Sequence, residues 1–291
     1  MSLRFLPKSH QYRMTEHPGP ATGPKGANPE LRATGATTLI GGGIPKPNLI
    51  YWAGKTVAEY VRDNPLDVDL LRQRDGAETL NEDGTVTKFD MVKELASVPN
   101  KVRDAAGERG SEVHDLAEAL LHGETVDVPD ELAPYVDGYL RLIDEWEITP
   151  VLTETSVGNR KDWYVGRLDS IVRIGKLGNC LVLLDWKTSR GVYGETALQT
   201  AGYARAEFYV TDDAPDVEIP LPQVDRTMVC HITPDGSFLY DLAKTPAEID
   251  RHYELFIAAA FTHKTQKERD AIITEPLTLP DTTTPEMSAA A

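Results

Sequence analysis

The chain has 291 residues, and its hydrophobic fraction of 41% is large enough to fill a core, so it can fold on its own. It contains no run of eighteen apolar residues, and its first residues lack the apolar stretch of a signal peptide, which argues against membrane insertion and secretion and predicts a cytoplasmic protein. A formal net charge of −16 argues against a protein that coats nucleic acid by bulk attraction, because phosphate binding depends on clustered Lys and Arg.

A mobile N-terminal arm is predicted for residues 1–48. Between Arg13 and Pro47 it is crowded with Gly, Pro and Thr, which favour loops. A helical region is expected over residues 49–148, with apolar spacing typical of core-facing helices. Its predicted elements are helices at Tyr51–Arg62 and Phe89–Ala96, a turn at Asn81–Gly84, a helix from Pro99 to His122, and a helix at Tyr135–Trp146.

After Pro150 the apolar pattern changes from helical to alternating, which indicates strands. The predicted elements of residues 149–265 are strands at Val151–Val157, Trp163–Ile174 and Cys180–Lys187, a helix at Glu195–Phe208, a hairpin of Arg226–Thr233 and Ser237–Leu242, and a closing helix at Ala247–Lys264. This order favours a mixed α/β fold of the α+β kind, with a central mixed sheet flanked by helices. A disordered tail is predicted for residues 266–291, because the sequence is rich in Thr and Pro from Thr274 onward.

Cys180 and Cys230 are the only cysteines. They could form one disulfide, but a cytoplasmic setting favours two reduced thiols. Two cysteines cannot ligate a four-cysteine iron–sulfur cluster, so no such cluster is expected.

A basic island interrupts the acidic chain between residues 159 and 190. Three acids, Asp162, Asp169 and Asp185, stand there against seven basic residues, which are Arg160, Lys161, Arg167, Arg173, Lys176, Lys187 and Arg190. Such a cluster suits contact with phosphates, and ordinary solvated strand and loop charge explains it equally well.

The third predicted strand ends in charged residues. Side chains alternate along a strand, so Asp185 and Lys187 share a face with Leu183. Burying either charge is costly unless it is paired or binds a metal, which points to a site. A simple Asp–Lys ion pair at a strand end is the alternative.

The preceding strand adds a second acid, Asp169, three residues after Gly166. Two acids on neighbouring strands could hold one or two hard cations, and carboxylate oxygens are ligands that Mg²⁺ and Mn²⁺ prefer. The alternative is that Asp169 is an edge residue paired with Arg167.

Two predicted helices present polar side chains at helical spacing. His114 shares a face with Gly110 and Glu118, and it could be either a ligand at the same site or a packing histidine. Gln199 and Tyr203 are also one turn apart and could contact a phosphate or a base.

Taken in order, these segments resemble the RecB-like nucleases of the PD-(D/E)XK superfamily. The resemblance covers about Ala105 to Ala206, with a looser likeness at Leu49–Ala53, and rests on GERGSEVH ending at His114, Glu154, Gly166-Arg167-Leu168-Asp169, LLDWKTS around Asp185, and Gln199 with Tyr203. It implies a restriction-endonuclease-like core. Because the four cluster-binding cysteines of some relatives are missing, the chain is similar to cluster-free exonucleases of the phage and CRISPR-associated type, in the bacterial cytoplasm or a phage-infected host.

The resemblance also implies roles for single residues. Asp169 and Asp185 correspond to the metal-binding acids, His114 to a further ligand, and the carbonyl of Trp186 to a backbone ligand. Lys187 corresponds to the catalytic lysine. The remaining matches are Gln199 and Tyr203, as elements that orient DNA, and Glu154, as an acid that either supports the ligands or is structural. Arg167 and Arg190 are further candidate substrate contacts.

The expected function is a Mg²⁺- or Mn²⁺-dependent deoxyribonuclease of DNA recombination, repair or phage DNA processing, leaving a 5′-phosphate and a 3′-hydroxyl. An exonuclease is favoured over a structure-specific endonuclease because no base-reading module is evident. A non-catalytic DNA-end-binding or scaffold protein is an alternative. A hydrolase of small phosphate esters is disfavoured, because Gly41-Gly42-Gly43 lacks the Lys-Ser/Thr of a phosphate loop. DNA is the expected partner, and no association with a membrane is expected. Whether the chain also binds a second copy of itself or a recombination protein is left open.

Overall fold

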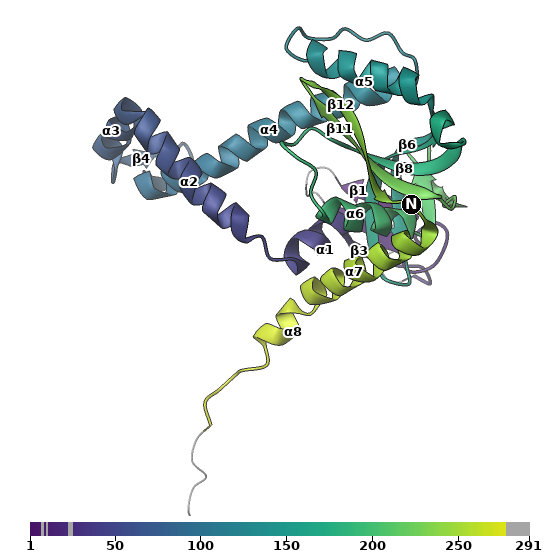
Figure 1. The fold of residues 1–291 in the computed structure, drawn as a ribbon. Helices are drawn as coiled ribbons and strands as arrows, with labels where there is room; N and C mark the ends of the chain where they lie inside the picture. Colours follow the sequence, from purple (N-terminus) through teal and green to yellow (C-terminus); the bar gives the residue numbers. More distant parts are fainter. Residues whose placement is uncertain (7–8, 10, 23–25, 278–291) are drawn as a thin grey trace, which may run out of the picture.

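A ten-stranded mixed sheet organises the chain in the computed structural model, which describes residues 1–6, 9, 11–22 and 26–277 (Figure 1). Its strands are β1 (Leu3–Leu6), β2 (Gln11–Thr15), β3 (Glu30–Gly35), β6 (Ile148–Asn159), β7 (Tyr164–Ile174), β8 (Cys180–Lys187), β9 (Phe208–Thr211), β10 (Ala214–Pro220), β11 (Arg226–Thr233) and β12 (Gly236–Ala243). A separate two-stranded hairpin is formed by β4 (Glu78–Leu80) and β5 (Val86–Lys88).

Two different strands pair with the same edge of β7, and the site described below lies where they separate. One edge of β7 pairs along its length with β6. On the other edge, β3 pairs in parallel with Tyr164 and Val165 only, whereas β8 pairs antiparallel with residues 170–174. We call the interval between Val165 and Ser170 the β7 fork. Since β11 continues the sheet parallel to β8, the predicted mixed sheet is confirmed.

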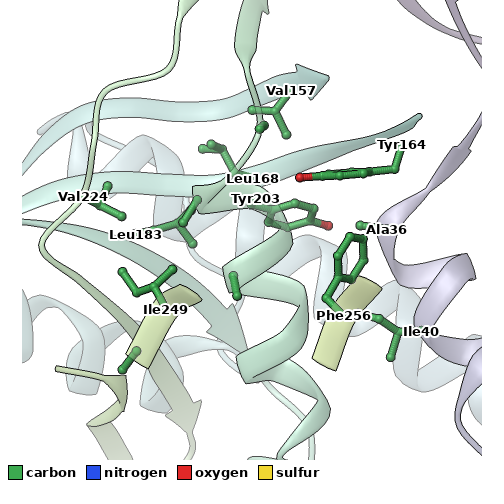
Figure 2. Packing of buried hydrophobic residues seen from close by; sticks show 14 of the residues in the cluster. Ala36, Ile40, Val157, Tyr164, Leu168, Leu183, Tyr203, Val224, Ile249 and Phe256 are labelled. Atoms are coloured by element: carbon green, nitrogen blue, oxygen red, sulfur yellow. The ribbon is translucent and has the colours of Figure 1, made fainter. Parts of the chain in front are cut away.

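Helices cover both faces of the sheet. The helices of the described residues are α1 (Ala36–Gly43), α2 (Pro47–Asp63), α3 (Pro65–Arg74), α4 (Met91–Leu121), α5 (Ala133–Trp146), α6 (Glu195–Ala204), α7 (Pro246–Lys264) and α8 (Gln266–Asp270), with a 3₁₀ turn at Gly175–Leu177. Of these, α2 and α3 pack mainly against α4 and project away from the sheet (Figure 1). One apolar cluster joins the sheet to α1, α6 and α7 (Figure 2), and a second joins its other face to α4 and α5. In the part of the chain that the structure describes, no helix combines the length and apolar character needed to cross a membrane.

The arm predicted for residues 1–48 is wrong over most of its described part. Three strands and α1 form there, and Leu3, Met14 and Leu39 are buried in the core. The density of Gly, Pro and Thr hid these short elements, because each gains its burial from distant segments rather than from its own pattern. Residues 7–8, 10 and 23–25 lie outside the described residues.

The two helices predicted on either side of residues 97–98 are one helix, α4, with Pro99 in its interior. A proline costs an internal helical hydrogen bond, but Val98 and Pro99 are buried, and this packing compensates. Asp90 is the N-cap of this helix, and its carboxylate accepts a hydrogen bond from the Lys93 amide at 3.0 Å. Its first half extends away from the sheet toward α2 and α3 (Figure 1).

Later elements follow the predictions more closely. The hairpin of β11 and β12 turns between Thr233 and Gly236, and Gly236 adopts a positive φ of 138°. The helix predicted to reach Phe208 ends at Ala204, because Phe208 begins β9 and pairs with β6. The predicted tail starts with the short helix α8, and its end, residues 278–291, lies outside the described residues.

The first and last helices of the core lie in close contact. A side-chain carbon at Gly42 would collide with the His263 ring, and one at Gly43 would collide with the Ala259 backbone. Glycines are therefore required where α1 crosses α7. This contact ties the N-terminal segment to the closing helix.

Candidate metal and phosphate site

The two predicted acids meet beside the β7 fork. Asp169 lies on β7, one residue before the pairing with β8 begins. Its carboxylate accepts a hydrogen bond from the Trp186 amide at 2.7 Å. The Asp169 side chain thus accepts a hydrogen bond from a β8 amide that lies beyond the last β7–β8 pair. This hydrogen bond fixes the carboxylate at the point where the two strands separate.

Asp185 is held from both sides. Its carboxylate accepts a hydrogen bond from Gln199 Nε2 of α6 at 2.9 Å through Oδ1. Oδ2 forms an ion pair with the Lys187 ammonium, although the pair lacks hydrogen-bond geometry and Oδ2 has no hydrogen-bond partner. Lys187 also donates to the Trp186 carbonyl at 3.4 Å. The simple Asp–Lys ion pair therefore exists, but it belongs to a larger cluster.

Burial and mutual repulsion disfavour two ionised acids in this cluster. Burial raises the pKa of Asp169 to about 6, against the opposing effect of the Lys187 charge. Burial and then the charge of Asp169 raise the pKa of Asp185 to about 7. The cluster thus has more negative charge than Lys187 alone compensates, which is the electrostatic setting in which a cation binds favourably.

His114 reaches the same place from α4. Its Nδ1 lies 4.0 Å from Asp169 Oδ2, and its ring contacts that of Trp186 edge-on with centroids 5.7 Å apart. A side-chain carbon at Gly110 would lie 3.1 Å from Thr188 Oγ1, a tight contact, so the glycine eases the approach of α4 to the segment after β8. Burial and then the Lys187 charge lower the pKa of His114, which keeps the imidazole neutral and able to donate a lone pair.

Glu154 completes a three-residue group with His114 and Asp169, whose ligand atoms all lie within 4.8 Å of one another. Its backbone has a φ of 41°, the left-handed region, inside β6. For a residue with a side chain this costs roughly 1–2 kcal/mol, so the surrounding structure must enforce it. Burial raises the pKa of Glu154, although Arg167 donates to Oε2 at 2.8 Å.

The predicted site residues come together with two differences. The three-residue group of possible metal ligands contains Glu154, whose role the sequence left open, and does not contain Asp185. Asp185 instead pairs with Lys187 and accepts a hydrogen bond from Gln199. The alternative in which Asp169 pairs with Arg167 is wrong, because Arg167 pairs with Glu154 and lies 3.6 Å from Asp212. Arg190 is exposed on the loop after β8 and makes no hydrogen bond or ion pair with a described residue.

Gln199 and Tyr203 act as one unit on α6. Gln199 Nε2 donates to the Tyr203 hydroxyl at 3.4 Å, and Tyr203 is buried at 4% exposure. A side-chain carbon at Gly166 would collide with the Tyr203 ring. The glycine of the Gly166–Asp169 segment therefore lets α6 approach the fork closely enough for Gln199 to hold Asp185.

Tyr12 and Glu118 also adjoin the site, and their part in it was not predicted. Burial raises the pKa of Tyr12, which also responds to the charges of Arg167 and Glu154. Glu118 contributes to the raised pKa of Glu154 from one turn beyond His114. The helical spacing placed Glu118 on the same face as His114, although no role in the site was assigned to it. Tyr12 carried no signal, because its segment resembled a loop.

Comparison with known proteins adds no assignment. No family model and no curated protein matches the sequence. Among solved structures, one described as "Crystal structure of SSO0001" is similar at 19% sequence identity over 57% of this chain and 65% of that one, with a TM-score of 0.27. The match thus spans somewhat less than two thirds of that chain, and its TM-score is too low to support an argument about fold or function.

Proposed function

We propose that the chain is a Mg²⁺- or Mn²⁺-dependent deoxyribonuclease with a restriction-endonuclease-like core, of the RecB-like kind that its motifs resemble. One observation carries this proposal. Five separate elements, α4, β6, β7, β8 and α6, bring a histidine, three acids, a lysine and a glutamine to the β7 fork. Packing alone does not require so many charged groups at one buried point.

The donor set fits a hard divalent cation. His114, Glu154 and Asp169 would hold it, with Asp185 and the Trp186 carbonyl nearby, both in contact with the Lys187 ammonium. Carboxylate and carbonyl oxygens suit Mg²⁺ and Mn²⁺, and imidazole is an acceptable further ligand. When bound, such an ion polarises a phosphoryl oxygen and lowers the pKa of water.

The chain's own residues supply the rest of the chemistry. The Lys187 ammonium lies beside Asp185 and the Trp186 carbonyl, where it can stabilise negative charge that develops on a phosphodiester during attack by water. Gln199 and Tyr203 hold Asp185 in place and so preserve this arrangement. Cleavage of the P–O3′ bond would leave a 5′-phosphate and a 3′-hydroxyl.

Cleavage assays with end-labelled linear DNA and covalently closed DNA test the proposal. Each substrate is incubated with Mg²⁺, Mn²⁺ or EDTA, and Lys187→Ala is compared with the control Lys176→Ala, an exposed lysine that pairs with Glu147 outside the site. We expect metal-dependent degradation of linear DNA, a loss of rate of at least about a hundredfold for Lys187→Ala, and normal rates for the control. Binding without cleavage under all metal conditions would instead identify a DNA-binding protein.

A further inference from the structure

His231 is a buried polar residue of β11 that has no part in the chemistry described so far. It is 8% exposed, and its Nε2 lies 2.6 Å from the Ser189 carbonyl oxygen. Because a carbonyl oxygen can only accept a hydrogen bond, Nε2 is the protonated ring nitrogen, and His231 donates. The Tyr240 ring of β12 lies beside the imidazole, with centroids 6.3 Å apart. The imidazole is thus a donor directed at the backbone of the segment that follows β8.

The strand register places His231 next to the lysine of the candidate site. Lys187 is the last residue of β8, and His231 lies directly opposite it in the parallel pairing with β11. Residues directly opposite one another in neighbouring strands share a face of the sheet. The His231 ring therefore lies on the Lys187 side of the sheet and reaches past the end of β8. Its hydrogen bond to Ser189 extends the attachment to β11 by two residues beyond the strand pairing.

The segment that leaves β8 makes a tight turn. Ser189 Oγ donates to the Gly191 carbonyl at 2.9 Å, which closes the chain around the exposed Arg190. On the other side, Thr188 adjoins α4, since its Oγ1 would lie 3.1 Å from a side-chain carbon at Gly110. The turn is therefore bounded by α4 at its first residue and held to β11 at its second.

Side chains of both neighbouring strands hold the end of β8 that carries Lys187. On the β7 side, Asp169 accepts a hydrogen bond from the Trp186 amide at 2.7 Å, beyond the last β7–β8 pair. On the β11 side, His231 donates to the Ser189 carbonyl. Each bond satisfies a backbone group that the diverging strands no longer pair. Lys187 lies between the two held residues, so its backbone position depends on both.

We infer that His231 is a positioning residue, which fixes Lys187 relative to the bound phosphodiester through the Ser189 carbonyl. The inference rests on the proposed function and deepens it, because His231 lies outside the motifs of the resemblance. The Lys187 ammonium must lie within hydrogen-bond reach of the charge that develops on the phosphate, and a misplacement of about 1 Å can lower a rate about a hundredfold. Release of Ser189 slows cleavage while the three-residue group of possible metal ligands stays in place.

Three variants separate positioning from folding. His231→Leu removes the donor and keeps an apolar side chain of similar size beside Tyr240. His231→Gln restores a donor, because its amide nitrogen can reach the place of the imidazole Nε2. Met228→Ala is the stability control. Met228 is a buried residue of the same strand, but it belongs to the apolar cluster on the other face, so its truncation weakens β11 without touching Ser189.

The single-turnover rate on end-labelled linear DNA in Mn²⁺ is compared with Mn²⁺ affinity and with DNA affinity in Ca²⁺, at a temperature at which all proteins are folded. We expect His231→Leu to lower the rate about ten- to a hundredfold and to leave both affinities within about twofold of wild type. His231→Gln should recover the rate to within about fivefold of wild type, because the donor is restored. Met228→Ala should cut at the wild-type rate.

Trypsin provides a readout that does not depend on DNA cleavage. The exposed Arg190 lies between Ser189 and Gly191, so the peptide bond after Arg190 becomes accessible when the turn opens. We expect trypsin to cut this bond about five- to tenfold faster in His231→Leu than in wild type, since local opening determines such cleavage. Met228→Ala should match wild type, and the bond after Arg74 at the end of α3 is the internal reference.

Each result against the inference differs from failure of the proposed function. An unchanged rate of DNA cleavage in His231→Leu would show that the hydrogen bond to Ser189 does not position Lys187. Equal losses in His231→Leu and Met228→Ala would assign the effect to overall stability, and a His231→Gln variant as slow as His231→Leu would exclude the hydrogen bond as its cause. If wild-type protein does not cut DNA in Mg²⁺ or Mn²⁺, the proposed function fails, and trypsin cleavage after Arg190 still decides whether His231 holds the turn.

Discussion

Replacement of Asp185 by Asn should stabilise the metal-free protein above neutral pH. Asparagine has nearly the shape of aspartate and can still accept the hydrogen bond from Gln199. It removes the charge that burial and Asp169 disfavour. The Lys187 partner of Asp185 is 27% exposed in its side chain, so its ammonium can remain hydrated after the change.

The size of the effect follows from the pKa. A rise from 3.8 to about 7 for Asp185 corresponds to roughly 4 kcal/mol of unfavourable free energy when the folded protein holds this acid ionised. Loss of the ion pair with Lys187 offsets part of this gain. We therefore expect the free energy of unfolding to rise by about 1–3 kcal/mol, and the melting midpoint by roughly 2–4 °C for each kcal/mol.

The sign of the pH dependence follows from the same shift. Because its pKa is raised, folded Asp185 retains a proton that the unfolded chain releases from about pH 4 upward, so the contribution of Asp185 to wild-type stability falls as the pH rises from about 4 to about 7. The variant should lose much of this slope and should differ little from wild type at pH 4.5. Urea unfolding in EDTA at pH 4.5 and pH 8 measures both effects.

A matched acid provides the control. Asp241 pairs with Arg226 at 3.0 Å on the partly exposed surface of β12, and Asp241→Asn should change stability by less than about 1 kcal/mol. If Asp185→Asn lowered stability at pH 8 and kept the wild-type pH slope, the Lys187 ion pair would dominate, and the electrostatic account of the site would be refuted.

Three further outcomes are expected. Glu154→Gln should weaken Mn²⁺ binding at least about tenfold in calorimetry without unfolding the protein, since it removes one charged donor of the three-residue group; unchanged affinity would exclude Glu154 as a ligand. Gly166→Ala should cost about 1–3 kcal/mol of stability in urea unfolding and reduce cleavage, because it forces Tyr203 and Gln199 away from the acids; wild-type stability would contradict the close approach. Leu39→Ala should cost about 2–5 kcal/mol in the same assay, whereas a solvent-exposed segment would lose almost nothing.

Strong local patterns made most of the later fold predictable. Alternation in the Cys180–Lys187 segment indicated a strand with Asp185 and Lys187 on one face, and Leu183 lies in one core cluster while Trp186 lies in the other. The division of the sheet at β7 could not be predicted. β3 forms only a two-residue parallel pairing with β7, which requires no particular side chains and leaves no period in the sequence.

The candidate site was predictable in its members but not in their partners. Strand alternation and helical spacing predicted that Asp169, Asp185 and His114 could lie at one site. The left-handed backbone of Glu154 could not be anticipated, because it depends on the tertiary surroundings in β6 rather than on the residue's own preference. For the same reason the pairing of Arg167 with Glu154, rather than with Asp169, became evident only from the structure.

The contact of α1 with α7 also determines when the chain can complete its core during synthesis. α1 ends at Gly43, whereas its partner helix begins at Pro246, about two hundred residues later. At the usual roughly 5–20 residues per second, the ribosome needs about 10–40 s to make that interval. Throughout this time the apolar side chains of α1, including Leu39 and Ile40, lack their final partner. Nascent chains arrested before α7 should therefore bind chaperones and be cleaved readily by protease, whereas release of the finished chain should protect the N-terminal strands.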